Sequence, residues 1–454
     1  MGRPWRGLVA SLLVGGCAVP PEAGFPDVAT AIEERTGLRI QWNRGSEADA
    51  AVEASVHQML AGDLTAAQAV QIALLENPML QAAYEELMVA QADVVQAGLL
   101  RNPTFSGHLG LPVPASSGTL GYGFGVELDF LDLLLLPARK RLAEAEHEAA
   151  KLRVGNEVLV LAHAVRVAYY TLQGAAQIAA MRRTVLEAAE ASASLARRQH
   201  EAGNISELDL ASEEGLAEAV RLDVARSEAD IVGARERLTR LMGVQGPSAR
   251  FTLAPALADL PADDPPLEHL ESLAIQRRLD VGAARAERTA SWRALVMAKD
   301  YRFVGGASVG ASVERDPEGH TVAGPSASVE LPLFDAKQAA VARLEARFRQ
   351  ANQRLAARSL DATSEVREAW GHLAFARSVV TRYRTTVIPL RERIVALSQQ
   401  HHDAMLLGVY QLLLAKQAEV STYREYIEAV RDYWIGRSEL ERALGGRLGP
   451  PSPR

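Results

Sequence analysis

The 454-residue sequence has a single cysteine, few aromatic residues and no excess of basic residues. Because Cys17 is its single cysteine, an intramolecular disulfide, Cys₂His₂ and Cys₄ zinc sites and an iron–sulfur cluster are excluded. Its 49 Lys and Arg residues are outnumbered by 56 Asp and Glu residues, which argues against a nucleic-acid-binding protein. Aromatic residues make up only 5%, so the core must rely on alanine, leucine and valine.

Long apolar runs and catalytic motifs are also missing. No run reaches the roughly 20 residues that a membrane-spanning helix needs, so a membrane crossing would have to be made by strands. The sequence has no P-loop, G-x-S-x-G or H-E-x-x-H motif, and we expect no enzyme. The carboxylates that could pair for acid–base chemistry lie in charge-mixed helical stretches, where a solvated face is expected: Glu213, Glu214, Glu365 and Glu368.

The N-terminus has the pattern of a bacterial secretory signal. Two arginines and a short apolar run make up residues 1–16, and Cys17 follows directly. The tetrapeptide Val14-Gly15-Gly16-Cys17 resembles a lipobox, which implies that Cys17 is lipidated and becomes the first residue. An ordinary signal peptide with a chance cysteine is the alternative. Ala18 in the next position, rather than aspartate, then implies sorting to the outer membrane.

The rest of the chain contains two related halves. Val126-Glu127-Leu128 recurs as Val329-Glu330-Leu331, and Val165-Arg166 recurs as Val366-Arg367, with an offset close to 200 residues. A period of this length indicates gene duplication rather than a solenoid. We divide the chain into a signal peptide (1–16), a lipidated connector (17–63), a first repeat (64–243), a linker (244–266), a second repeat (267–446) and a disordered tail (447–454).

Each half is predicted to form a helix, a strand hairpin, a very long helix, a turn and a partner helix. The capping box Thr65-x-x-Gln68 opens the first helix. The long helices run from Ala138 to about Glu201 and from Ala336 to His401, each about 95 Å long. Pro389 should kink or divide the second. Short helices are also expected near Val28–Thr36 and Glu47–Leu60, and the partner helices are expected at Ser206–Met242 and Val409–Leu444.

The predicted hairpins alternate apolar residues with small polar or acidic ones. The clearest stretch, Tyr122 to Phe130, keeps this period of two over nine residues. A half-buried sheet of a soluble protein gives this pattern, and so does a transmembrane barrel strand. Four strands per chain cannot close a barrel, and open sheet edges are not tolerated in lipid. The membrane interpretation therefore requires two chains, giving eight strands, or three, giving twelve.

Several phrases resemble the outer membrane factor family, the TolC-like channels of tripartite efflux pumps. They are Leu64 to Pro78, Gln96 to Pro103 and Val329 to Asp335, and the resemblance extends from Leu64 to Gly446. It implies a mainly α-helical fold with membrane β-structure. In a homotrimer, four strands per chain would form a 12-stranded barrel and the helices a periplasmic α-barrel. It also implies no cofactor, no catalysis, a location in the outer membrane, and partnership with a periplasmic adaptor and an inner-membrane pump.

In this family, the turns between the long helices contact the adaptor. The matching residues are Gly203, Asn204, Ile205 and Ser206 in the first half, and Met405, Leu406, Leu407 and Gly408 in the second. We expect Leu406 and Leu407 to be exposed for apolar contact.

TolC narrows its periplasmic gate with aspartates just after the second turn. The matching positions here are Gln411 and Leu414, and Asp209 holds the corresponding place in the first half. The resemblance therefore implies a more apolar gate.

His401 and His402, near Met405, are weak candidates for transient metal contact, because consecutive residues do not share a helix face. No resident metal is predicted. The stretch 405–414 is loosely similar to metal-resistance members of the family. The leading hypothesis is thus a passive exit duct for small solutes, with heavy-metal ions first among the substrates. The alternatives are a type I protein secretion channel and a periplasmic coiled-coil scaffold lipoprotein that transports nothing.

The lipidation hypothesis predicts that Cys17→Ser abolishes metabolic labelling of the protein with a radioactive fatty acid. The substitution removes the only thiol to which an acyl chain could be attached. Labelling that persists in the variant would rule out Cys17 as the lipid attachment site.

Overall fold

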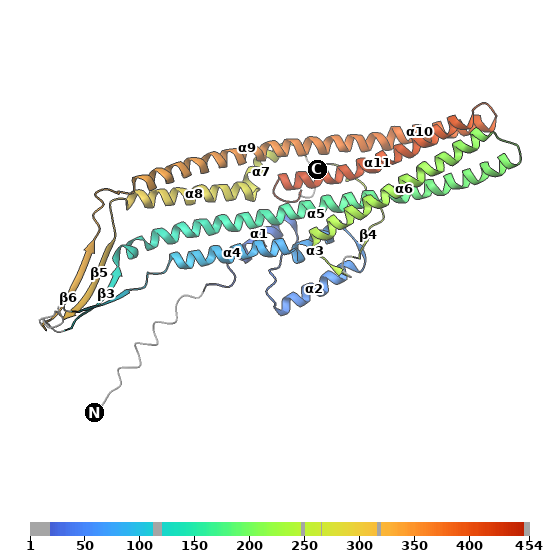
Figure 1. Cartoon of the computed structure of the whole chain (residues 1–454). Coiled ribbons are helices and arrows are strands. Elements are labelled where there is room, and N and C mark those ends of the chain that lie inside the picture. The colour runs from blue at the N-terminus through green and yellow to red at the C-terminus, as the bar shows by residue number, and fades with distance from the viewer. Residues whose placement is uncertain (1–18, 112–119, 247–249, 265, 316–318, 449–454) are drawn as a thin grey trace. The chain divides into compact units, whose positions relative to one another are not determined.

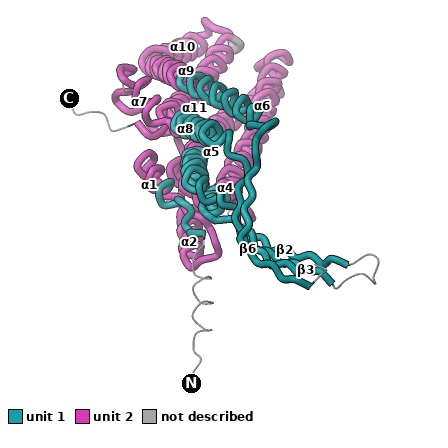
Figure 2. Tube along the Cα trace, turned by 90° about the vertical axis from the view of Figure 1, so that its left-hand side faces the viewer, with its two compact units in different colours: residues 1–28, 85–154, 280–359 teal, residues 29–84, 155–279, 360–454 magenta. Residues whose placement is uncertain are grey.

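The computed structural model describes residues 19–111, 120–246, 250–264, 266–315 and 319–448. The chain divides into two compact units (Figure 2). Unit 1 comprises residues 1–28, 85–154 and 280–359, and unit 2 comprises residues 29–84, 155–279 and 360–454. The predicted signal peptide, Cys17 and most of the predicted tail lie outside the described residues.

Helices dominate the described chain (Figure 1). Among the described residues, no helix is both long enough and apolar enough to cross a membrane. In chain order the elements are α1 (Phe25–Thr36), α2 (Glu47–Leu60), β1 (Asp63–Leu64), α3 (Ala66–Glu76), α4 (Pro78–Ala97), β2 (Thr104–Gly110), β3 (Gly121–Asp129), α5 (Phe130–Glu201), α6 (Glu207–Met242), β4 (Thr252–Leu253), α7 (Leu270–Arg277), α8 (Leu279–Asp300), β5 (Ala307–Arg315), β6 (Thr321–Val329), α9 (Gln338–Arg382), the π-helical turn η2 (Tyr383–Val387), α10 (Ile388–Asp403) and α11 (Val409–Ala443).

The local signals for helix formation are confirmed in unit 2. The hydroxyl of Thr65 accepts a hydrogen bond from the Gln68 backbone, and the Gln68 side chain accepts one from the Thr65 backbone. The apolar seam of α5 is buried at Val158, Val165 and Leu172. In the same seam, the Tyr169 hydroxyl donates to the Leu64 carbonyl at 2.7 Å.

Pro389 divides the second long helix, as its sequence predicts. Proline has no backbone N–H, and its ring clashes with the preceding turn, so regular α-helical bonding cannot continue through it. The chain responds with the wider turn η2, in which the N–H of Ile388 bonds to the carbonyl of Tyr383, five residues back. Helix α10 then starts with proline in its first turn, where the missing donor is tolerated.

The first long helix starts earlier than predicted, at Phe130 rather than Ala138. The Asp129 carboxylate accepts a hydrogen bond from the backbone N–H of Asp132 at 3.2 Å and so caps the helix. The helix then continues through Pro137 despite the loss of one backbone hydrogen bond. The prediction started the helix directly after Pro137 and placed Asp129 within the strand.

Unit 1 contains an antiparallel sheet in the order β2-β3-β5-β6. Its register places Phe105 opposite Val126, Phe124 opposite Val313, and Val309 opposite Ala327. Because opposite residues share a face, the apolar residues of all four strands collect on one side, apart from Val322, which lies opposite Glu314. The other side carries glycine, serine, histidine and acidic residues. The predicted hairpins are thereby confirmed, and they join into one sheet.

The carboxylate of Asp132 fixes the end of this sheet to the start of α5. It is buried, accepts the Arg139 side chain at 2.6 Å and the Arg101 backbone N–H at 3.1 Å, and also lies 3.6 Å from the Arg101 side chain. Burial alone would raise the pKa of this carboxyl, but the bonds to Arg139 and Arg101 outweigh burial and lower it. Asp132 therefore stays ionised and holds β2 and β3 together where they leave the sheet.

Asp132→Asn should lower the free energy of unfolding by about 2 kcal/mol, because charge-assisted hydrogen bonds are replaced by weaker ones and Arg139 loses its counter-ion. Guanidinium unfolding of the detergent-solubilised protein measures this. Asp335→Asn is the matched control, since Asp335 occupies the related position of the second half and is exposed. Equal effects of the two substitutions would contradict the anchoring role of Asp132.

Candidate functional site: helix tips and sheet faces

The first helix tip connects α5 to α6. Gly203 adopts a left-handed conformation (φ 75°), and no atom lies within 4 Å of where a Cβ would stand. The ring nitrogen Nδ1 of His200 lies 3.2 Å from the Ile205 carbonyl and braces the turn. Ser206 and Asp209 form a reciprocal capping box that opens α6. This tip is therefore built from ordinary turn and capping chemistry.

The second tip connects α10 to α11 and repeats this geometry with a less suitable residue. Met405 occupies the left-handed position (φ 59°), which a side chain with a Cβ disfavours by about 1–2 kcal/mol. Its side chain is 95% exposed and that of Leu406 is 74% exposed. The expected exposure of Leu407 is wrong, because its side chain is half-buried. An exposed apolar pair thus stands on a turn under backbone strain.

The predicted gate residues lie at the starts of the partner helices. The Asp209 carboxylate accepts hydrogen bonds from the Ser206 hydroxyl at 2.7 Å and the Ser206 backbone at 3.2 Å. The Gln411 carbonyl oxygen accepts one from the Gly408 backbone at 2.9 Å. Leu414 is 47% exposed. The polar groups of Asp209 and Gln411 therefore turn back onto their own helices. The S-x-x-D spacing was a readable capping signal that the sequence analysis did not use.

The histidines of the second tip have different surroundings. His402 Nδ1 lies 3.1 Å from the Leu407 carbonyl. His200 makes the equivalent contact with the Ile205 carbonyl in the first tip. The structural counterpart of His200 is therefore His402, and the exposed His401 has no equivalent bond. Within the described ranges, no group of three or more His, Cys, Asp or Glu side chains could hold a metal ion.

The carboxylates singled out in the sequence do not form a pair suited to acid–base chemistry. Glu213 is buried and accepts a hydrogen bond from the Ser192 hydroxyl at 2.8 Å, so the expected solvated face is wrong for this residue. Glu365 accepts bonds from Arg278 at 2.7 Å and Arg442 at 3.1 Å. Glu213 thus links α5 to α6 through a neutral hydroxyl, whereas Glu365 neutralises two arginines of unit 2.

The two faces of the sheet differ sharply in polarity. On the apolar face, side chains as large as Phe105 (69%) and Leu109 (70%) remain exposed. On the polar face, His108 reaches across Gly123 to within 3.6 Å of Glu314, and a Cβ on Gly123 would lie 2.3 Å from the imidazole. Glycine thus makes room for this contact between an imidazole and a carboxylate. The alternation in the sequence predicted the two faces, but this cross-strand contact depends on strand register and could not be read locally.

The described chain has the fold of outer membrane efflux channels. The CmeC outer membrane channel of Campylobacter jejuni gives a TM-score of 0.73 at 15% identity, covering 84% of this chain and 85% of that chain. VceC, an outer membrane protein of Vibrio cholerae, gives 0.71 at 16% identity, covering 87% and 97%. CusC gives 0.72 at 17% identity, covering 85% and 92%. At these identities the likeness establishes the fold alone.

Sequence comparison adds the family. Residues 69–244 match the family described as outer membrane efflux protein. No curated protein matches the sequence. The first half of the chain is therefore similar to outer membrane efflux proteins, and the resemblance seen in the sequence is confirmed.

Exchanging residues between the two tips should exchange their stability. Met405→Gly should strengthen the second tip by about 1 kcal/mol, because glycine adopts the left-handed conformation without steric cost. Gly203→Met should weaken the first tip by a similar amount, and the open space around Gly203 means that backbone strain alone is tested. Amide hydrogen exchange at the two turns measures both effects. Unchanged exchange in both variants would show that the positive φ angles carry no strain.

Proposed function

We propose that the chain forms, as a homotrimer, the outer membrane exit duct of a tripartite efflux pump. It passes small solutes, with heavy-metal ions as the leading class. An inner-membrane pump and a periplasmic adaptor deliver these solutes. The observation that carries the proposal is the four-stranded sheet of unit 1, which has one exposed apolar face. Within the described chain, each of its two edge strands pairs with a neighbour on one side only. Lipid would cover the face, and neighbouring copies would pair the edges.

The order of the strands supports closure by identical copies. Strands β2 and β6 are the two edges, and every neighbouring pair within the sheet is antiparallel. With four strands per chain, β6 of one copy can pair antiparallel with β2 of the next. Two copies would close eight strands, whose interior is largely filled by side chains. Three copies close twelve and leave a wider passage lined by the polar face.

The tips supply the proposed contact with the adaptor. Met405 and Leu406 expose apolar surface on a strained turn, which a partner surface would cover. The other proposed contact residues are Leu407, Gly408 and, in the first tip, Gly203 to Ser206. The gate is proposed at Gln411 and Leu414, with Asp209 as the one acidic group. It would be less selective for cations than a ring of aspartates. Cys17, lipidated, would anchor each copy to the membrane.

The proposal is tested by the oligomeric mass of the mature protein extracted from outer membranes in mild detergent. We expect three copies. Phe124→Lys should deplete the trimer, because a lysine facing lipid costs about 2–4 kcal/mol at the bilayer midplane. Ser312→Lys, on the polar face of the same sheet, is the matched control and should still assemble. A monomer that tolerates both substitutions would favour the periplasmic scaffold.

The substrate class needs a separate measurement. A strain lacking the protein should become sensitive to copper, zinc or silver and regain resistance with the intact gene. Sensitivity confined to dyes and detergents would replace metal ions with organic solutes. A defect confined to secretion of a protein would favour the type I channel.

A further inference from the structure

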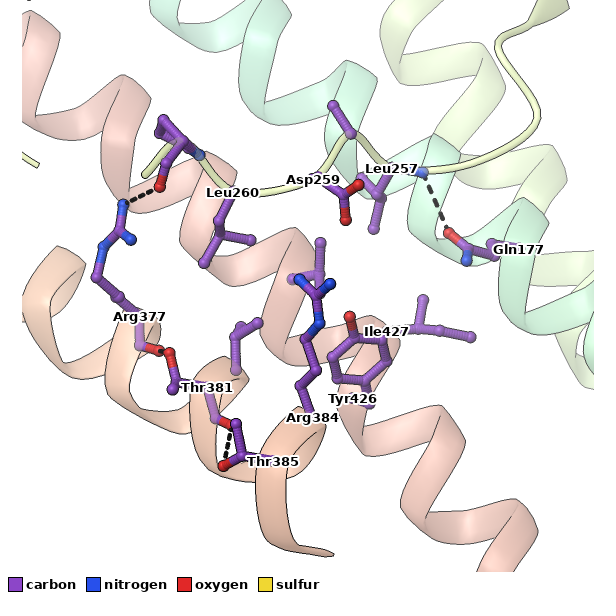
Figure 3. Close-up of a pocket in the computed structure, with 14 residues that line it drawn as sticks. Gln177, Leu257, Asp259, Leu260, Arg377, Thr381, Arg384, Thr385, Tyr426 and Ile427 are labelled. Atoms are coloured by element: carbon purple, nitrogen blue, oxygen red, sulfur yellow. Dashed lines mark hydrogen bonds between the residues drawn. The ribbon is translucent and has the colours of Figure 1, made fainter. Parts of the chain in front are cut away.

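A cavity of about 410 Å³ lies in unit 2 where the linker between the two halves crosses α9 and α11 (Figure 3). Bonds to the helices hold the linker in place. The Asp264 carboxylate accepts Arg377 at 2.6 Å and the Tyr433 hydroxyl at 2.7 Å. The Leu257 backbone N–H donates to Gln177, and the Trp434 indole donates to the Ala258 carbonyl. The cavity is thus preformed rather than opened by a mobile segment.

One part of the cavity wall is apolar. Val380, Ile427 and Val430 are buried side chains of α9 and α11, and Leu257 and Leu260 of the linker are half-buried. The volume falls within the roughly 300–1,000 Å³ of small-molecule sites. The cavity therefore has room for a small ligand with an aliphatic body.

Two side chains of opposite charge line this cavity, and no ion pair joins them. Asp259 comes from the linker and Arg384 from η2, and Figure 3 shows their side chains directed into the cavity from opposite sides. Neither makes a hydrogen bond or ion pair with another group of the described chain, and neither does the Tyr426 hydroxyl. In contrast, Arg377 in the same wall is bonded to Asp264, Tyr433 and two linker carbonyls. The unbonded groups are therefore available to a ligand.

The position of Arg384 depends on the π-helical turn. Thr381, Arg384 and Thr385 line the cavity from one side of this segment, and their spacing is that of neighbours on a helix surface. Both threonine hydroxyls donate to backbone carbonyls of their own helix and keep free lone pairs. Such turns occur frequently at functional sites. Here the turn presents an arginine to an apolar cavity.

We propose that this cavity binds an aliphatic α-amino acid. The carboxylate of the ligand pairs with Arg384, its ammonium group with Asp259 and the Tyr426 hydroxyl, and its side chain with Leu257, Leu260 and Ile427. A simple anion would leave Asp259 facing its negative charge, and a simple cation would leave Arg384 facing its positive charge. A zwitterion can form a charge-assisted hydrogen bond with each of the two groups. None of the residues that line this cavity is among those proposed for the gate or the adaptor contacts.

The test uses the full mature protein in lipid nanodiscs and titration calorimetry. L-leucine is the probe, 4-methylpentanoate is the same body without the ammonium, and 3-methylbutylamine is the same body without the carboxylate. We expect L-leucine to bind, and each analogue to bind at least about tenfold more weakly, since each loses one charge-assisted contact. Absence of L-leucine binding at millimolar concentration would overturn the proposal. Equally tight binding of 4-methylpentanoate would also overturn it, because an anion site would then suffice.

Two substitutions assign the charges. Arg384→Gln should weaken binding of L-leucine and 4-methylpentanoate by about tenfold or more and leave the amine unchanged. Asp259→Asn should weaken binding of L-leucine and the amine and spare the carboxylate. Both residues are exposed and unbonded, so the variants should fold, which circular dichroism checks. The control Arg382→Gln changes an exposed arginine at the end of α9, outside the cavity, and should bind L-leucine normally. Equal binding by all variants would refute the assignment.

Discussion

The buried carboxylate of Asp132 is the contact on which the geometry of unit 1 depends. It joins the chain entering β2, through Arg101, to the first turns of α5, through Arg139, so that the ends of one hairpin are held at a single point. The second half makes this junction with a different group, because the Lys337 ammonium beside α9 donates to the Tyr301 and Val304 carbonyls at 3.3 Å and 3.2 Å. Asp335 is exposed and accepts a hydrogen bond from the Lys337 backbone. There, residues 330–337 separate β6 from α9. One hairpin is thus fixed by a buried charge, whereas the other leaves the sheet through a longer connection.

Several features of the isolated chain are costly by themselves and are relieved by assembly. Unpaired strand edges expose backbone donors and acceptors, and a contiguous apolar face exposes hydrocarbon to water. Met405 holds a strained backbone conformation to present an apolar side chain. In the proposed duct, a neighbouring copy would pair the strand edges, lipid would cover the apolar face, and an adaptor would cover Met405. The proposed amino-acid cavity differs from these features, because hydrogen bonds within the chain already hold its walls. Of its lining side chains, the charged Asp259 and Arg384 have no bonded partner in the described chain.

Local patterns in the sequence predicted most of the fold because periodicity, proline and capping residues act over a few residues. The capping box at Thr65, the division at Pro389 and the alternating strands are confirmed for this reason. The start of α5 at Phe130 was missed because the cap at Asp129 was read as part of a strand. The burial of Glu213 and the half-burial of Leu407 depend on neighbouring helices. The cavity could not be predicted, because its linker has no periodic pattern and Arg377 meets Asp264 across 113 residues. The roles of the tips and gate stay predictions.

The π-helical turn also preserves the rotational phase of the helix that follows it. An α-helix advances by about 100° per residue, and a π-turn accommodates one additional residue in a wider turn. Deleting one residue between Tyr383 and Val387 would therefore restore an ordinary α-helical turn and leave the same side chains of α10 facing α11. Deleting one residue from the regular part of α9 would instead rotate the side chains that follow by about 100°. At this one place the chain can shorten by a residue without changing which surface α10 presents.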